Sequence, residues 1–138
     1  LWRHKRMQIA IIVEGKNDRS RLRRLLSEEI EIFCTYGTPG TDRIEQLKKT
    51  IGTAPVYIFT DNDASGKKIR AILRDAFPDA EQIYTRKGYA GVEGTPDEYL
   101  VQQLEKAGLE AFIDRTLLLD ELNQVNDQRD RKYAEHGR

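Results

Sequence analysis

Short apolar runs alternate with amphipathic stretches along the chain, and this order predicts an α/β fold. The runs at 8–13 and 56–60 are apolar and rich in β-branched residues, which is typical of strands that a sheet buries on both faces. Residues 30–36 alternate apolar and polar side chains, which favours a strand with one less buried face, and 81–85 is a fourth expected strand. Because helices separate the strands, we expect a mainly parallel central sheet of about four strands.

Helices are predicted between these strands from the spacing of apolar residues. Leucines recur on one stripe of residues 17–29, which indicates an amphipathic helix. Asp42 with Glu45 three residues later resembles a capping box that opens a second helix. The stripe after residue 63 predicts a third helix, which Pro78 stops.

The remainder of the chain is expected to hold a loop, a helix and a tail. Residues 86–96 are Gly-rich and predict a loop. Pro96 suits the first turn of a helix that runs to Ala107, and Gly108 ends it. Apolar positions from 117 to 125 suggest a final helix, and a polar tail follows residue 127. We therefore expect an N-terminal extension at 1–7, one main domain at 8–107, and a C-terminal helix with a polar tail at 108–138.

Composition limits the possible classes without selecting one. The chain has 138 residues, of which 38% are hydrophobic, which fits one compact domain. Lys plus Arg and Asp plus Glu are equal at 23 each, so net charge gives no general argument for nucleic acid or a membrane. Residues 1–27 contain eight basic and two acidic residues, an excess of six positive charges. That excess would suit a phosphate-rich substrate, and a solvated helix face is the equally plain alternative.

The cellular setting is inferred from what the sequence lacks. Cys34 is the single cysteine, so an internal disulfide is impossible and a reducing cytoplasm is expected. No apolar run approaches the ~18 residues of a membrane span, and no membrane association is expected. The N-terminus lacks the features of a signal peptide, and Met7 is a candidate native start.

Two acidic clusters stand where apolar runs stop. Glu14 with Gly15 follows the first run, and Asp61-Asn62-Asp63 follows the third. In an open parallel sheet, ligands bind outside the carboxyl ends of the strands, so the three carboxylates are expected to converge there. Their mutual repulsion favours a hard divalent cation such as Mg²⁺. The alternative is that these residues are ordinary turn and N-cap residues.

These clusters, in this order, resemble a known domain. Val13-Glu14-Gly15-Lys16-Asn17-Asp18 and Phe59-Thr60-Asp61-Asn62-Asp63-Ala64-Ser65-Gly66 are similar to the motifs of the Toprim domain, which topoisomerases, bacterial primases and some nucleases share. Segments 63–70 and 91–98 resemble the Toprim half of the bacterial ribonuclease that matures small ribosomal RNA. The Thr-Pro-Asp-Glu stretch at 95–98 also resembles a primase motif. The resemblance covers residues 8–107 and implies a Rossmann-like Toprim fold and a bacterial source.

The resemblance implies roles for individual acids. Asp61 and Asp63 would hold Mg²⁺, for which Mn²⁺ is a possible substitute, and Glu14 would be a further ligand or the general acid/base at a phosphodiester. Asp18 and Asp97 occupy positions that carry additional acids in primases. Thr95 stands where the primase pattern has Asp, so the choice between one and two metals stays open.

Basic and aromatic residues near these motifs are candidates for substrate contacts. Lys67 and Lys68 fall in the first turn of the third helix, where free backbone N–H groups also attract phosphate. Three further candidates for phosphate or nucleic-acid binding are Lys16, Arg19 and Lys87. Tyr36 and Tyr89 could stack on bases, although such aromatics more often serve packing.

Three functions remain in view. Mg²⁺-dependent phosphodiester chemistry on nucleic acid, most specifically RNA hydrolysis related to rRNA maturation, is the leading hypothesis. The alternative is a non-cleaving nucleic-acid or nucleotide binding module that acts with a partner protein. A phosphoryl-accepting regulator is less favoured, because the acids after the third strand form a close pair. RNA is favoured over DNA by the resemblance.

Overall fold

A four-stranded parallel sheet forms the centre of the molecule. The structure is a computed structural model and describes residues 7–116. Its strands are β1 (Ile9–Val13), β2 (Ile30–Cys34), β3 (Val56–Ile58) and β4 (Glu81–Gln82), in the order β2-β1-β3-β4. All three strand pairs are parallel, and Ile11 of β1 lies between Ile32 and Tyr57. The predicted α/β fold with a mainly parallel sheet of four strands is confirmed.

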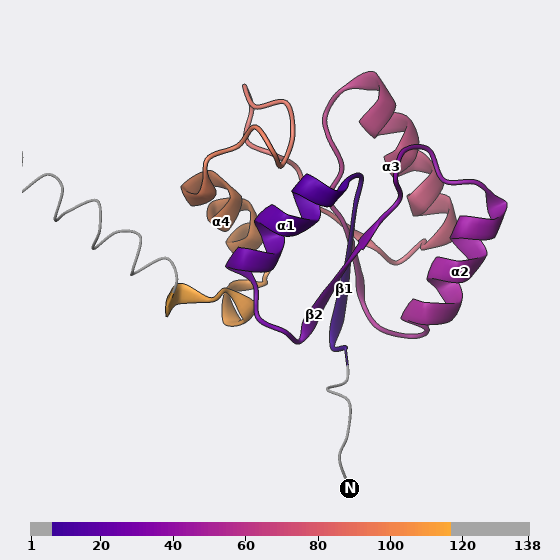
Figure 1. Cartoon of the computed structure of the whole chain (residues 1–138), viewed down its shortest axis with the longest axis horizontal. Coiled ribbons are helices and arrows are strands. Elements are labelled where there is room, and N and C mark those ends of the chain that lie inside the picture. The colour runs from indigo at the N-terminus through magenta and orange to yellow at the C-terminus, as the bar shows by residue number, and fades with distance from the viewer. Residues whose placement is uncertain (1–6, 117–138) are drawn as a thin grey trace, which may run out of the picture.

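Helices cover both faces of this sheet. Figure 1 shows α1 (Lys16–Leu25) and α4 (Asp97–Lys106) on one side, and α2 (Thr41–Ile51) and α3 (Ala64–Ala76) on the other. Alternate residues of β1 enter two separate apolar cores, Ile9, Ile11 and Val13 in one, Ala10 and Ile12 in the other. This two-sided burial is the reason why β1 is apolar at every position.

Several predicted element boundaries are wrong, and β2 and β3 each end two residues earlier than expected. α1 ends at Leu25 instead of about residue 29, because Leu26 is extended and forms an antiparallel bridge with Ile113. The Asp42 capping box is absent, since Gly40 is the N-cap of α2 and no side chain caps it. The fourth strand has two residues and not the predicted 81–85.

The segment that follows α4 adds to the same body. Gly108, with a φ of 87°, ends α4 as predicted. A short 3₁₀ turn that the sequence did not predict, Glu110–Phe112, comes next. Leu109 and Ile113 are buried in the α1–α4 core. The predicted final helix and polar tail lie outside the described residues. Among residues 7–116, no helix has the length and apolar character to cross a membrane.

Arg70 fixes the carboxyl ends of β3 and β4 from beneath. It is buried on α3, and its guanidinium donates to the carbonyl oxygens of Ile58 (3.2 Å), Thr60 (2.8 Å) and Ile83 (2.9 Å). A fourth bond goes to Gln82 Oε1 at 2.5 Å. Only a planar fork of donors can reach so many acceptors at once. The chain therefore leaves β3 along one defined path towards Asp61.

Arg70→Lys is expected to destabilise the fold by about 3 kcal/mol, because one ammonium group leaves several buried carbonyls without a donor. Arg74→Lys, on the exposed side of the same helix, is the matched control and should change stability by less than about 0.5 kcal/mol. Urea unfolding of both variants measures the difference. Equal losses would show that the Arg70 bonds are not specific.

Candidate functional site

Glu14 and Asp61 meet at the carboxyl edge of the sheet. β1 and β3 are neighbours, and the pairing continues past β3 through the bond from Phe59 N–H to Ile12 O at 2.9 Å. One residue beyond β1, Glu14 Oε1 accepts the Asp61 backbone N–H at 2.9 Å. The structure thus brings together the two acidic clusters that are 47 residues apart in sequence.

Asp63 and Asp18 both lie at helix N-termini. Asp63 Oδ1 accepts the Gly66 N–H at 2.6 Å and is the N-cap of α3. Asp18 is buried in the first turn of α1, and its Oδ2 accepts the Gly15 N–H at 3.0 Å. One oxygen of each carboxylate therefore has the turn or N-cap role that the alternative interpretation gave to these acids. The second oxygen of Asp63 has no hydrogen-bond partner among the described residues.

An open cleft of about 590 Å³ lies beside Glu14 and Asp61. Its lining combines four carboxylates with one aromatic ring and small residues, which are Glu14, Asp18, Asp61, Glu93, Tyr36, Gly15, Gly37, Ala90, Gly91 and Gly94. Asp63 is exposed just outside this lining. The small residues leave carboxylate and backbone groups accessible to a ligand, so the cleft is the candidate functional site.

Carboxylates crowd one another in this cleft. Burial raises the pKa of Asp61 to about 6, and the charges of Glu14, Asp18 and Asp63 add to the increase. Burial also raises the pKa of Glu14, against the lowering effect of the Asp61 N–H. The pKa of Asp18 is raised by burial and by Glu93. The negative charge of the site is therefore incompletely compensated by the protein itself.

The donor chemistry of the cleft fits a hard divalent cation. Oxygen atoms of carboxylates are the ligands that Mg²⁺ and Mn²⁺ take. The charge of Asp63 raises the pKa of both Glu14 and Asp61, which places the three carboxylates near one another. Within residues 7–116, no three acidic, histidine or cysteine side chains are arranged to hold an ion as they stand. Asp63 points to its helix cap and Asp18 to Gly15. Glu14, Asp61 and Asp63 are the residues that could hold a metal.

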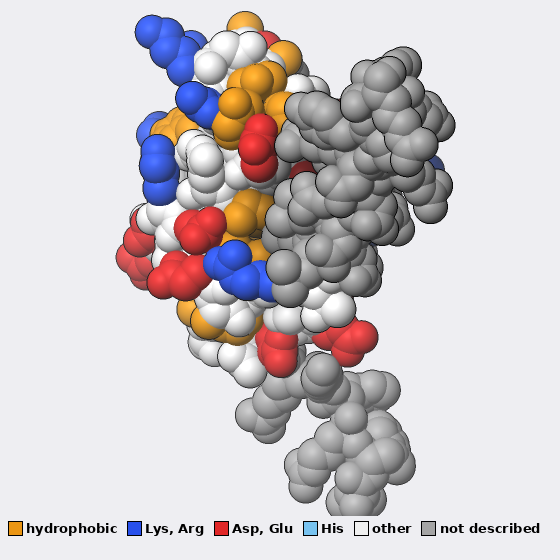
Figure 2. Space-filling view, turned by 90° about the vertical axis from the view of Figure 1, so that its left-hand side faces the viewer, with side chains coloured by type: hydrophobic (Ala, Val, Ile, Leu, Met, Phe, Trp, Pro, Cys, Tyr) orange, Lys and Arg blue, Asp and Glu red, His pale blue; other side chains and the backbone are white. Residues whose placement is uncertain are grey.

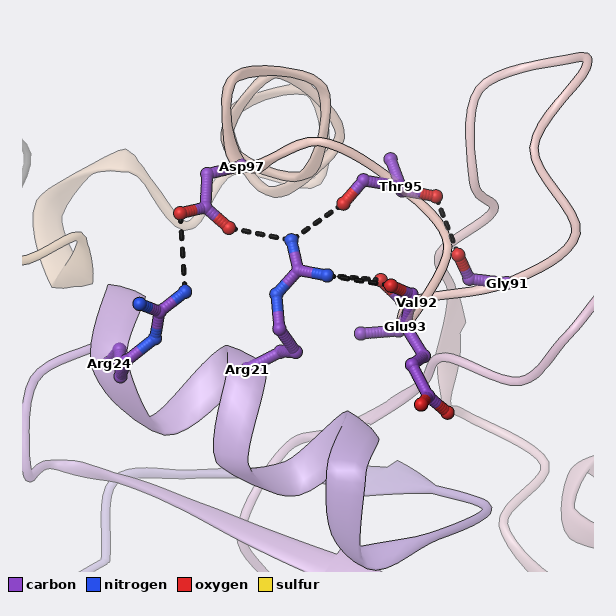
Figure 3. A network of polar contacts seen from close by, with 7 residues as sticks. All are labelled: Arg21, Arg24, Gly91, Val92, Glu93, Thr95 and Asp97. Atoms are coloured by element: carbon purple, nitrogen blue, oxygen red, sulfur yellow. Dashed lines mark hydrogen bonds and ion pairs between the residues drawn. The ribbon is translucent and has the colours of Figure 1, made fainter. Parts of the chain in front are cut away.

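Arg21 of α1 holds the loop that closes this cleft (Figure 3). Its guanidinium donates to the carbonyl oxygens of Glu93 (2.8 Å) and Thr95 (2.6 Å), and to Val92 O at 3.4 Å. Thr95 Oγ1 in turn donates to Gly91 O at 2.5 Å. The loop is thereby fixed against α1 although about 70 residues separate them in sequence.

Asp97 belongs to this loop anchor and not to the cleft. Its carboxylate forms ion pairs with Arg21 at 2.6 Å and with Arg24 at 3.3 Å, as Figure 3 shows. The structure therefore places the predicted metal ligand Asp97 with two arginines, away from Glu14 and Asp61. Thr95, which stands at the primase Asp position, is buried and bonded to Gly91.

Glu93 is a cleft residue that the sequence analysis missed. It lines the cleft, and its Oε1 accepts from Asn17 Nδ2 at 3.2 Å. The charge of its carboxylate adds to burial in raising the pKa of Asp18, while its backbone N–H has the opposite effect. The resemblance of segment 91–98 contained the signal, because that segment includes Glu93. Asp18 and Glu93 thus form a second acidic pair at the α1 side of the cleft.

The predicted basic residues are exposed and do not line the cleft. Five exposed side chains share this placement, namely Lys16, Arg19, Lys67, Lys68 and Lys87. Lys16 opens α1, and Lys67 and Lys68 follow the Asp63 cap of α3. Figure 2 shows several Lys and Arg side chains towards the top of the face near α4, at the end to which the strands run in Figure 1. Lys16, Lys67 and Lys68, at the starts of α1 and α3, are placed to contact a ligand larger than the cleft.

Comparison with known proteins defines the class. The model of the Toprim domain family matches residues 9–90, so the chain belongs to the Toprim domain family. It is 33% identical over 103 residues to YusF of Bacillus subtilis, covering 75% of this chain and 70% of that protein. A solved structure described as a small TOPRIM domain protein from Bacillus stearothermophilus is 34% identical with a TM-score of 0.71, covering 82% of this chain and 94% of that one.

Two further relatives have an enzyme name. Ribonuclease M5 of Fusobacterium nucleatum is 32% identical over 109 residues, which span 75% of this chain and 60% of that protein. Ribonuclease M5 of Lactococcus lactis is 34% identical over 103 residues, which span 68% and 49% respectively. The chain therefore matches only about half to three fifths of these two relatives.

Gly91→Ala is expected to disturb the site while sparing the fold. A Cβ at Gly91 would lie 1.9 Å from Asp61 Oδ1, an atom that can move, whereas a Cβ at Gly94 of the same loop meets nothing within 4 Å. We expect Gly91→Ala to weaken Mg²⁺ binding by about 10-fold or more, and Gly94→Ala to leave it unchanged. Calorimetric titration with Mg²⁺ measures both, and equal affinities would contradict the placement of Asp61.

Asp61→Asn is expected to stabilise the metal-free protein near neutral pH. The pKa of the Asp61 carboxyl is raised to about 6 in the folded protein. The folded state therefore binds more protons than the unfolded state between about pH 4 and about pH 6, so the free energy of unfolding falls as the pH rises through this range. The gain from Asp61→Asn should therefore be larger at pH 7 than at pH 4, by no more than about 1 kcal/mol since solvent screens this partly exposed group. Urea unfolding in chelator measures the two gains, and the same gain at both pH values would refute the repulsion.

Proposed function

We propose that this domain hydrolyses phosphodiester bonds of RNA in a reaction that depends on Mg²⁺. The observation that carries the proposal is the direct contact between Glu14 and Asp61 at the carboxyl edge of the sheet, beside an open cleft with further carboxylates. This edge is where parallel α/β sheets bind ligands. The Toprim family membership and the Ribonuclease M5 relatives support the same chemistry.

Each carboxylate has a proposed role. Asp61 and Asp63 would hold the cation, and Mg²⁺ would supply charge stabilisation at phosphate oxygens when bound. Glu14 accepts the proton of the attacking water or donates a proton to the leaving oxygen of the phosphodiester. Its raised pKa, caused mainly by burial, favours that role, because an acid/base works best with a pKa nearer the operating pH. Its Oε1 bond to the Asp61 N–H fixes the carboxylate in position.

RNA is the proposed substrate, and the surrounding lysines its backbone contacts. Lys16, Lys67 and Lys68 are exposed at the ends of α1 and α3 that adjoin the cleft, where they can pair with phosphates flanking the reacting one. Because the chain spans 60% and 49% of the Ribonuclease M5 relatives, we assign recognition of a particular RNA to a partner protein or a further segment. The reaction is proposed to take place in the cytoplasm.

A non-cleaving binding module is the second candidate. Glu14, Asp63 and Asp18 each accept a backbone N–H that shapes a turn at the site. Those bonds would be needed whether or not the domain cleaves. In this case the same cleft and lysines would bind nucleic acid together with a partner protein, and Glu14 would serve as a structural residue.

Glu14→Gln separates the two candidates. Glutamine keeps the acceptor for the Asp61 N–H but cannot transfer the proton, so we expect cleavage to fall by about 100-fold or more with RNA affinity within about 3-fold of wild type. A panel of labelled RNA and DNA, single-stranded, duplex and hairpin, measures cleavage with Mg²⁺, Mn²⁺ or chelator. Asp61→Asn combined with Asp63→Asn is the second variant, since asparagine also caps helices well, and it should abolish metal dependence.

Metal-dependent cleavage by wild type that persists in Glu14→Gln would reject the acid/base role. If wild type binds RNA in a metal-dependent manner but yields no cleavage product, the binding module is favoured. Loss of the fold in the double variant would show that its carboxylates are structural above all.

A further inference from the structure

Tyr36 stands at the rim of the cleft, tied to Glu14. It follows β2 by two residues, its backbone N–H donates to Glu14 O at 2.8 Å, and it is one of the residues that line the cleft together with Glu14 and Asp61. The residue is 58% exposed. A large aromatic side chain is therefore kept in solvent directly beside the proposed chemical centre.

The backbone at Tyr36 is strained. Its φ is 56°, and within residues 7–116 it is the only non-glycine residue with a positive φ. Asn, Asp or Gly adopts this conformation at lower cost than an aromatic residue. Strain of this kind at a site residue indicates that the side chain itself is needed there. More than half of the residue is exposed, so burial of the ring is not the whole reason for a tyrosine at this position.

Arg43 supports the ring. Its guanidinium carbon lies over the Tyr36 ring, 5.9 Å from the centroid, within the range of a cation–π contact. Arg43 is fixed in turn, because it donates to Cys34 O at 2.6 Å and to Gln46 Oε1 at 2.8 Å. The exposed ring is thus held in place before any ligand arrives, which lowers the cost of ordering it.

Tyr89, the other aromatic candidate for base stacking, is already engaged. The centroid of its ring lies 5.4 Å from that of Tyr99. The guanidinium carbon of Arg86 lies over the Tyr99 ring, 4.1 Å from the centroid. Neither ring lines the cleft. The geometry separates the two candidates that the sequence left equal, and it leaves Tyr36 as the aromatic surface of the site.

We propose that Tyr36 stacks on an unpaired nucleobase next to the phosphate that the cleft carboxylates act on, which makes single-stranded RNA the preferred substrate class. A base inside a duplex cannot offer its face to a side chain, whereas loops, bulges and ends can. Ring stacking is tolerant of base identity, so Tyr36 selects for strandedness more than for sequence. This inference rests on the proposed function and refines its substrate.

Tyr36→Asn is the decisive variant, because its two effects have opposite signs. Asparagine tolerates the positive φ, so the melting temperature should rise or stay constant, while loss of the ring should weaken RNA binding by about 5- to 150-fold. Tyr36→Phe keeps the ring and should bind like wild type. The probe is a short single-stranded RNA containing 2-aminopurine, whose fluorescence is quenched when the base stacks.

Tyr84→Asn is the matched control. Tyr84 is 51% exposed and also has an arginine over its ring, Arg70 at 4.2 Å, but it does not line the cleft. We expect Tyr84→Asn to keep RNA affinity and quenching. An abasic site in place of 2-aminopurine should weaken binding to wild type by the factor lost in Tyr36→Asn, and should cost that variant nothing further.

The outcomes separate this inference from the proposed function. Unchanged affinity and quenching in Tyr36→Asn, with cleavage of RNA by wild type intact, overturns the stacking role alone. Equal weakening of single-stranded and duplex RNA in Tyr36→Asn also overturns it, since stacking requires an unpaired base. Failure of wild type to bind or cleave any RNA overturns the proposed function together with the inference.

Discussion

Parallel pairing of β1 with β3 is the constraint on which the rest of the site depends. The register that sets Ile11 against Tyr57 brings both strands to an end at the same level of the sheet, so that Glu14 can accept the Asp61 N–H. Arg70 fixes the last carbonyls of β3 from the α3 side. A shift of one residue in this register would turn the side chains of β1 to the wrong cores and separate the two acids.

Residues of the site hold the fold and crowd charge at the same time. The carboxylate of Asp63 caps α3, and Glu14 bridges to β3, yet their charges raise the pKa of Asp61 further than burial does alone. A cation would relieve this repulsion without breaking those bonds. The loop bound by Arg21 brings Gly91 so close to Asp61 that a side chain at Gly91 would displace the Asp61 carboxylate. Function and stability therefore compete at one edge of the sheet.

Local pattern was sufficient for the architecture and for the two acidic clusters. An apolar run at β1 and helical stripes at α1 and α3 identify elements, and parallel topology then requires Glu14 and Asp61 to share an edge. The partners of Asp97 could not be read from its neighbours in sequence, because Arg21 lies 76 residues away on another helix. The burial of Arg70 was hidden for the same reason, since its acceptors are carbonyls of β3 and the β4 end. The Asp42 capping box was wrong because Gly40 is the N-cap of α2, two residues earlier than the sequence motif requires.

Binding of Mn²⁺ to the isolated protein, followed by electron paramagnetic resonance of the free ion, tests the central claim most directly, because it requires no substrate. Asp61→Asn is compared with Asp79→Asn. Asp79 is exposed and precedes β4, so it lies at the amino-terminal end of the strands, away from the cleft. Wild type and Asp79→Asn should bind Mn²⁺ saturably, and Asp61→Asn should lose this binding. Saturable binding of equal affinity in all three proteins would contradict the central claim, because the ion would then be held elsewhere.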